Sequence, residues 1–221
     1  MTKEEFLEKV TFKDNEEREN ALFYINMKGL YLHVMIFDYL SKETGNEQIS
    51  WKQISDELRK DKGLRDILYI YLATLEEYIR AYISNKYSDN CIDQSFWINE
   101  REKHNKISDN IKKGKPLFFV LQDVDFGTLI KQVLSLPQTD IEEMLWGNGT
   151  EQNLDAVKQL RNCVGHHQFL KMCKLKSCSV DGVESNSLIN NIRNLEQLLP
   201  EEYRYGKNGK GGIEADYSRF L

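Results

Sequence analysis

The sequence predicts an all-α protein, a bundle of helices with little or no sheet. Apolar residues recur at spacings of three and four over most of the chain, which is the period of one helix face. Only 3 prolines interrupt the 221 residues. The short apolar run at 117–121 has no second run of its kind with which to form a sheet. We therefore expect a single all-helical domain over residues 1–200, followed by a tail rich in glycine and tyrosine over residues 201–221.

The composition narrows the class of protein. With 40% hydrophobic and 29% charged residues, the chain resembles a globular protein that buries a real core. No stretch approaches the roughly 20 consecutive apolar residues that a membrane helix needs, and the opening MTKEEFLEKV is charged where a signal peptide is apolar. The 4 cysteines are too few for a disulfide framework in a chain of this length. We expect a cytoplasmic protein with reduced thiols and no membrane partner.

The first half of the chain carries three segments with helical spacing. These segments are residues 15–43, 49–59 and 64–87. The first contains no proline, so we expect one long helix that ends near Ser41–Gly45. The third has the longest apolar stripe in the chain, which predicts a central core helix.

The second half carries shorter helical segments. The expected helices are residues 96–113, 117–121, 126–136, 139–146 and 187–199. Gly114 and Pro116 end the first of them, and we interpret the apolar 117–121 as buried helix or a connector rather than a strand. Pro137 separates the next two helices, and Pro200 ends the last.

A further helix follows the loop at 147–150 and begins a basic region. Asn153 or Asp155 is expected to cap this helix, whose apolar residues continue to Val164. Residues 156–180 contain no acid at all. The cations of this region are Lys158, Arg161, Lys171, Lys174 and Lys176.

Charge argues for local rather than general binding of a polyanion. A net charge of −5 and a pI near 5.5 exclude an indiscriminate nucleic-acid coat, because such binding needs many clustered Lys and Arg. The basic region at 156–180 is a local exception, and further basic stretches lie at 101–115 and 206–212. We expect Lys158, Lys171, Lys174 and Lys176 to contact an RNA backbone, the alternative being a solvated basic face.

The most specific segment is Leu160–His167, which reads LRNCVGHH and places Arg161 five residues before His166. It resembles the Arg-x4-His signature of HEPN ribonucleases, in the form typical of the abortive-infection (Abi-like) branch. The segment LEEYIRAYI at 75–83 and the segment FGTL at 126–129 also resemble that branch, in the same order. The resemblance spans roughly residues 15–175. It departs at Gln168, where some toxins of the superfamily carry a regulatory tyrosine.

The resemblance implies a fold and an activity. The fold is a HEPN-like helical bundle with additional helices. The activity is that of a metal-independent endoribonuclease in an abortive-infection or toxin-type antiviral defence system. In this family two domains pair so that their motifs share a cleft, which implies a homodimer. The resemblance also implies that a noncoding RNA or a protein antitoxin restrains the enzyme, because an unregulated ribonuclease kills its host.

The residue types fit RNA cleavage without reference to any family. Transesterification needs a base for the 2′-hydroxyl, an acid for the leaving oxygen and a cation for the phosphorane. His166 is the candidate acid or base and Arg161 the phosphate clamp. Residues five apart on a helix diverge by about 140°, so either Gly165 loosens the turn or a dimer completes the site. We expect Asn162 to orient His166 or to contact RNA, His167 to support it, and no metal or cofactor to be needed.

Other interpretations of the same residues remain open. Arg161 and His166 can be a surface arginine and a histidine that satisfies carbonyls at a helix end. His166, His167, Cys173 and Cys178 can be zinc ligands, although their spacing does not match the usual pairs. A catalytically inactive HEPN module that binds a structured RNA or a protein is the main functional alternative, and a purely structural helical adaptor is the third.

Overall fold

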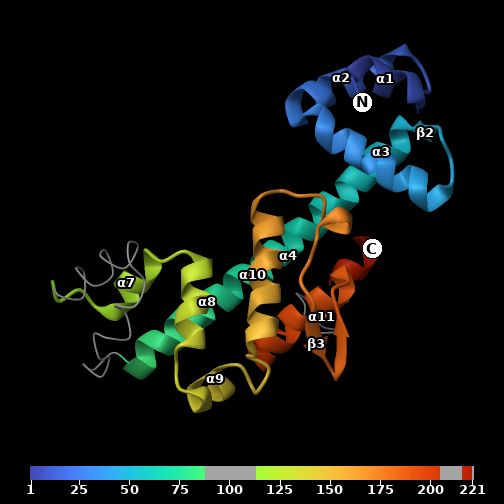
Figure 1. The fold of residues 1–221 in the computed structure, drawn as a ribbon. Coiled ribbons are helices and arrows are strands. Elements are labelled where there is room, and N and C mark those ends of the chain that lie inside the picture. The colour runs from blue at the N-terminus through green and yellow to red at the C-terminus, as the bar shows by residue number, and fades with distance from the viewer. Residues whose placement is uncertain (88–112, 205–215, 221) are drawn as a thin grey trace. The chain divides into compact units, whose positions relative to one another are not determined.

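The structure is a computed structural model that describes residues 1–87, 113–204 and 216–220. These residues form nine α-helices and two small two-stranded sheets, which confirms the predicted all-α fold (Figure 1). They divide into two compact units. The first contains residues 1–67, 163–174 and 217–220, and the second contains residues 68–87, 113–162, 175–204 and 216. None of the helices described is long and apolar enough to cross a membrane.

The first unit is built from the N-terminal helices and a short parallel sheet. Its elements are α1 (Lys3–Lys9), β1 (Val10–Thr11), α2 (Asn15–Lys28), α3 (Leu30–Thr44), β2 (Ile49–Ser50), the start of α4 (Trp51–Tyr87), η1 (Leu170–Met172) and η3 (Ser218–Phe220). The Thr2 side chain and Glu5 form a capping box at the start of α1. Val10 pairs with Ile49 in the sheet. The core of the unit includes Phe6, Ile36 and Phe169, all fully or nearly fully buried.

The single long helix expected at 15–43 was wrong. The chain forms α2 and α3, which are separated at Gly29. Gly29 has φ 89° and ψ 140°, a backbone conformation that essentially only glycine adopts, so the helical hydrogen bonding stops there. The predicted end near Ser41–Gly45 is confirmed, because Gly45 closes α3 in the left-handed conformation.

The two helices expected at 49–59 and 64–87 were also wrong, because they are one. Helix α4 runs without interruption over 37 residues, from Trp51 to Tyr87. Gly63 stays helical at the expected break, where a Cβ atom would overlap the ring of Phe220. The Asp61–Arg65 ion pair at 2.8 Å joins successive turns at this point. The glycine therefore makes room for a packed ring rather than ending a helix.

The second unit holds the later helices and an antiparallel hairpin. Its elements are the remainder of α4, α7 (Leu117–Gln122), α8 (Phe126–Leu134), α9 (Gln138–Met144), α10 (Glu151–Gly165), β3 (Cys178–Val180), β4 (Val183–Ser185), α11 (Leu188–Leu198) and η2 (Glu201–Tyr203). The last turn of α10 belongs to the first unit. The helices predicted on both sides of Pro137, over 117–121 and before Pro200 are confirmed, but the burial expected over 117–121 is only partial, because Phe118 and Phe119 are exposed.

The cap of α10 was predicted at the wrong residue. The Thr150 hydroxyl accepts a hydrogen bond from the Asn153 backbone N–H at 3.2 Å, so Thr150 is the N-cap. Asn153 instead is buried and turns its side chain to the hairpin: its amide donates to the Ser179 carbonyl at 3.1 Å and accepts from the Ser179 N–H at 2.9 Å. A residue that suits a cap by type is used here to join two elements.

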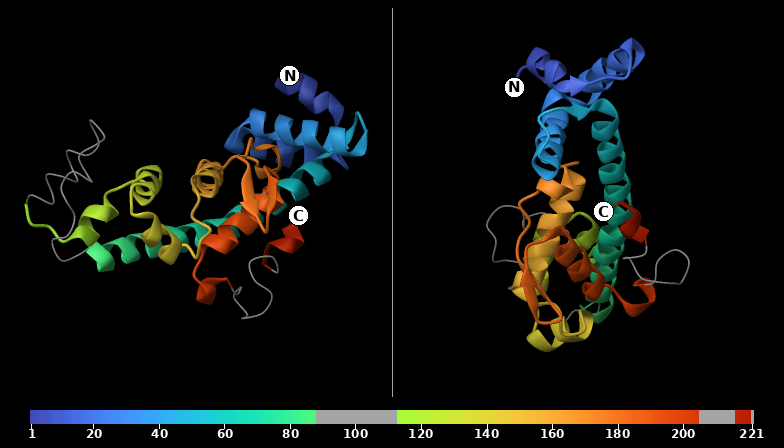
Figure 2. Two further views of the ribbon diagram at one scale, coloured as in Figure 1. Left: turned by 60° about the horizontal axis from the view of Figure 1, so that its bottom comes forward. Right: turned by 90° about the vertical axis from the view of Figure 1, so that its right-hand side faces the viewer.

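The β3–β4 hairpin was not predicted. Asp181 and Gly182 both have positive φ, and Val180 pairs with Val183 across them, as in a two-residue hairpin turn. The hairpin lies against α11 (Figures 1 and 2), where the Asn190 side chain donates to the Cys178 carbonyl at 2.8 Å. The predicted charged helix at 96–113 lies almost entirely outside the described residues, as do the basic stretch at 206–212 and most of the tail.

Candidate functional site at the end of helix α10

Helix α10 ends in a hydrogen-bonded turn that carries both histidines of the motif. The His167 N–H donates to the Val164 carbonyl at 3.1 Å, and the Gln168 N–H donates to the Cys163 carbonyl at 3.0 Å. This pair of bonds is a Schellman motif, in which His166 is the C-cap and His167 occupies the left-handed position after it. His167 has φ 54°, a left-handed value that favours glycine. The turn therefore carries an imidazole at a position where glycine, which has no side chain, is common. Both histidines are exposed.

His167 is held by a network from α4 within the first unit. Its Nδ1 atom lies 3.1 Å from an Nη of Arg65. Arg65 Nε donates to Asp61 at 2.8 Å, and the second oxygen of Asp61 accepts from the Leu170 N–H at 2.8 Å. Burial raises the pKa of the Asp61 carboxyl, against the opposing effects of the Leu170 N–H and Arg65. The sequence reasoning missed Asp61 and Arg65, whose only local signal is their spacing of four on a helix.

Arg161, Asn162 and His166 differ from His167 in having no side-chain partner within the part of the chain that the structure describes. Arg161 and Asn162 are half-buried on α10, and His166 is exposed just after its end. Among the described residues, none forms a hydrogen bond or an ion pair with these three side chains. The helix continues through Gly165, so His166 stands outside it and the expected i, i+4 relation to Asn162 does not apply. All three groups remain available to a ligand.

Of the four lysines predicted to contact RNA, three form ion pairs with acidic residues and one has no ion pair within the described residues. Asp155 accepts ion pairs from both Lys158 and Lys176, and the Lys158 hydrogen bond is the main reason that the pKa of its carboxyl is lowered. Lys171 lies 2.8 Å from Glu57 and over the ring of Tyr39. Lys174 is exposed and has no hydrogen bond or ion pair to any described residue. Acids outside 156–180 thus partner three of the four lysines.

The cysteines proposed as zinc ligands have other surroundings. Neither Cys173 nor Cys178 forms a disulfide within the described part of the chain. Cys178 lies in β3 of the second unit, where the Asn190 amide lies 3.4 Å from its sulfur, and its burial raises its pKa. No group of three or more His, Cys, Asp or Glu side chains that could hold a metal ion occurs within 1–87, 113–204 and 216–220.

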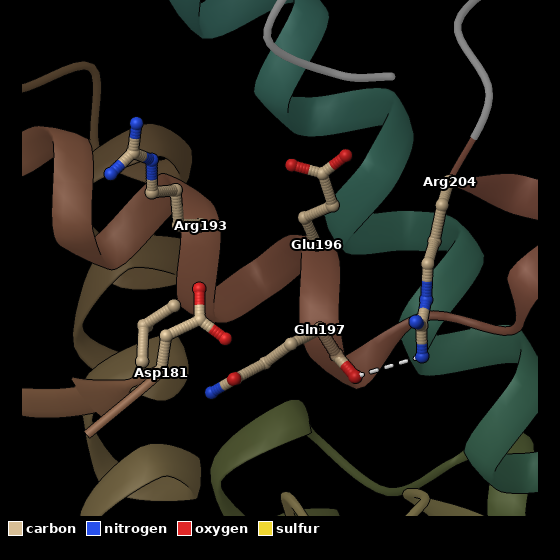
Figure 3. A pocket seen from close by; sticks show the side chains of 6 residues that line it. Asp181, Arg193, Glu196, Gln197 and Arg204 are labelled. Carbon is tan, nitrogen blue, oxygen red and sulfur yellow. Dashed lines mark hydrogen bonds between the residues drawn. The ribbon is translucent and has the colours of Figure 1, made fainter. Parts of the chain in front are cut away.

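A surface recess of about 480 Å³ lies in the second unit (Figure 3). Its walls are formed by Val180, Asp181, Arg193, Glu196, Gln197 and Arg204. Arg204 donates to the Gln197 carbonyl at 3.2 Å and lies over the ring of Trp146. None of the residues predicted from the motif lines this recess, whose lining includes both acidic and basic side chains. It offers no distinct chemistry.

No protein-family model, curated protein or solved structure matches this chain. The functional assignment therefore rests on the residues of the motif and their surroundings.

Proposed function

We propose that this protein is a metal-independent endoribonuclease, and more specifically a HEPN ribonuclease of the Abi-like branch that acts in antiviral defence. The observation that carries the proposal is the end of α10. The exposed His166 follows Arg161 by five residues, and neither side chain has a hydrogen bond or an ion pair to a residue that the structure describes. A structural histidine at a helix end would satisfy carbonyls, whereas at this helix end the Val164 and Cys163 carbonyls accept from the backbone N–H groups of His167 and Gln168.

The chemistry assigns a role to each group. His166 takes or returns the proton of the ribose 2′-hydroxyl or of the leaving 5′-oxygen, since an imidazole titrates near neutral pH. Arg161 holds the phosphate through its planar, permanently charged guanidinium. Asn162, half-buried and without a side-chain partner in the described ranges, adds a neutral hydrogen-bonding group. The 2′-oxygen attacks, a cyclic phosphate forms, and the 5′-oxygen leaves with a proton.

A homodimer is part of the proposal. One chain has a single Arg-x4-His segment, and the family pairs two of them across a cleft. Lys174, which is exposed and has no ion pair with any residue that the structure describes, is the best-placed of the four lysines to contact the RNA backbone. A noncoding RNA or an antitoxin would keep this activity in check.

A second candidate is an inactive HEPN module that binds a structured RNA or a protein. The observation that favours it is the pairing of Lys158 and Lys176 with Asp155, which lowers the positive charge available near the motif. Such a module would bind RNA at low salt without cutting it.

Incubation with total RNA separates these candidates. We expect the wild-type protein to cut RNA in the presence of a chelator and to leave 2′,3′-cyclic phosphate and 5′-hydroxyl ends. His166→Ala and Arg161→Ala should each lower the cleavage rate by about 100-fold or more. Arg193→Ala, a substitution of an exposed arginine on α11, is the matched control and should cleave normally. Binding without any cut, alone or with a partner, would favour the inactive module; full activity of folded His166→Ala would refute the assignment.

A further inference from the structure

The side chain of His167 is fixed in one tautomer by its partner. A guanidinium only donates hydrogen bonds, so the His167 Nδ1 atom, 3.1 Å from Arg65, must accept. The ring proton then resides on Nε2, and the bonded form of the imidazole is neutral. Protonation of Nδ1 would remove this bond and place two cations against each other. The turn therefore presents an N–H donor rather than a base.

The partner of His167 is itself rigidly held. The side chain of Arg65 is only 12% exposed and that of Asp61 only 2% exposed. One Asp61 oxygen accepts from Arg65 and the other from the Leu170 N–H, which anchors the segment after the turn to α4. Two backbone bonds of the Schellman motif fix the His167 main chain from the other side. The imidazole has both its backbone and its Nδ1 edge constrained, while the residue remains exposed.

The backbone of His167 supports a role for its side chain. A left-handed residue at this point of a helix end is most often glycine, which would adopt φ 54° without a penalty. Here a histidine occupies the position and is bonded through its ring to a buried ion pair. His166, the adjacent residue, has no such bond among the described residues. The two imidazoles thus differ in their surroundings: the ring of His167 is bonded to Arg65, whereas that of His166 has no partner among the described residues.

We infer that Asp61 and Arg65 are positioning residues that hold His167 as the neutral Nε2–H tautomer, ready to donate to a phosphate oxygen of the RNA. The inference rests on the proposed nuclease function. A neutral imidazole donor can stabilise developing negative charge without exchanging its proton, and this leaves the proton transfers to His166. Among the charged or titratable groups, Arg65 is recorded against His167 itself, while Glu57 of α4 and Cys173 after the turn are recorded around the Asp61–Arg65 pair.

The tautomer is measured directly by nitrogen NMR of the histidine rings. At neutral pH we expect His167 to show protonated Nε2 and unprotonated Nδ1, and its Nε2 signal to shift when an RNA with a 2′-deoxy substitution at the cut site binds. Arg65→Lys keeps the charge beside Asp61 but lacks the fork that reaches both partners. In that variant His167 should become a mixture of tautomers. Arg59→Lys, on the same helix and paired with Asp56 at the surface, is the matched control.

Activity gives a second, independent measurement. Arg65→Lys should lower kcat/KM for RNA by about tenfold, the equivalent of one hydrogen bond, and should add a histidine titration to the pH profile. Arg59→Lys should change neither. If wild-type protein cuts nothing but its His167 has the expected tautomer and responds to RNA, the nuclease proposal fails and the positioning inference holds. If RNA is cut but His167 carries its proton on Nδ1, or Arg65→Lys alters neither tautomer nor pH profile, the positioning inference is overturned.

Discussion

The Lys171 ammonium lies 2.8 Å from the Glu57 carboxylate, and this contact joins the segment after the candidate site to α4 within the first unit. Glu57 is only 6% exposed, and its Oε1 atom lacks an aligned hydrogen bond, so the contact is an ion pair rather than a well-formed hydrogen bond. Lys171 also covers the ring of Tyr39. A lysine that the sequence suggests for RNA contact already neutralises a buried charge.

Lys171 and Lys174 should therefore respond differently to alanine substitution. Lys171→Ala leaves Glu57 buried without its cation, which should lower the free energy of unfolding by about 3 kcal/mol. Lys174→Ala should change the free energy of unfolding by less than about 0.5 kcal/mol. It should weaken RNA binding and reduce the slope of the logarithm of the binding constant against the logarithm of the salt concentration by about one. Urea unfolding and RNA titrations at several salt concentrations measure both. Equal losses of stability in the two variants would contradict a structural role for Lys171 and an RNA-binding role for Lys174.

Two asparagines of α10 should separate folding from activity. Asn153 is 3% exposed and exchanges two hydrogen bonds with Ser179, whereas Asn162 is half-buried without a partner among the described residues. Asn153→Ala leaves backbone groups of the hairpin unpaired and should cost about 2 kcal/mol of stability. Asn162→Ala should leave stability unchanged and lower RNA cleavage. Thermal unfolding and cleavage assays on both variants test this, and a reversed pattern would exclude Asn162 from the site.

The sequence predicted a helix correctly where its boundary is set by residues nearby in the chain, such as a proline or the end of an apolar run. Pro137 and Pro200 mark real helix boundaries, and the apolar run at 117–121 is a helix as expected. Glycine was ambiguous: Gly29 separates two helices while Gly63 lies inside one. The difference depends on Phe220, which is far away in sequence and packs against Gly63. The hairpin did leave a signal, Asp181–Gly182 between two valines, which is typical of a two-residue turn.

The candidate site shows the same division. Arg161 and His166 stand out because their residue types and spacing suit phosphate chemistry. The contact between Arg65 and His167 joins residues 102 apart in sequence, and no local pattern indicates it. Likewise, the absence of acids from 156–180 suggested free positive charge, but Glu57, from elsewhere in the chain, and Asp155, just outside the segment, pair with its lysines. The fold determines which charged residues come into contact, and the local sequence does not reveal these contacts.

Gly29 should be far less tolerant of substitution than Gly45. Gly29 has φ 89° and ψ 140°, whereas Gly45 has φ 70° and ψ 11°, close to the left-handed helical conformation that asparagine accepts. Gly29→Asn should cost about 2 kcal/mol, and Gly45→Asn less than about 1 kcal/mol. Urea midpoints of the two variants give the comparison. Similar costs at both positions would mean that the chain between α2 and α3 can relax.

His33 should make the first unit less stable in mild acid. Its ring is fully buried and stacked on Trp51; its Nδ1 is bonded to the Gly29 carbonyl, and its Nε2 has no hydrogen-bond partner among the described residues. Burial lowers the pKa of His33, and Lys28 lowers it further, against the opposing effect of the Gly29 bond. Because the folded pKa lies below the unfolded 6.5, the unfolded chain takes up a proton first as the pH falls. This stability is fully present above about pH 6.5 and declines below it, by at most about 1.4 kcal/mol per pH unit.

The measurement for His33 is a comparison with a variant that cannot titrate. We expect the free energy of unfolding of wild-type protein to fall more between pH 7.5 and pH 5.5 than that of His33→Gln. The exposed His166 and His167 are present in both proteins, so their contributions cancel. Parallel pH dependence in the two proteins would show that the fold does not hold His33 neutral.

The two adjacent histidines should differ when each is replaced by glycine. His166 is the C-cap, where glycine only adds chain flexibility and should cost about 0.5 to 1 kcal/mol. At His167, glycine removes a left-handed strain of about 1 kcal/mol and also removes one hydrogen bond of similar value to Arg65, so stability should hardly change. RNA cleavage should fall in both variants. Urea unfolding and cleavage assays, made side by side, separate the effects. A loss of more than about 2 kcal/mol in His167→Gly would show that this imidazole is retained for folding rather than for chemistry.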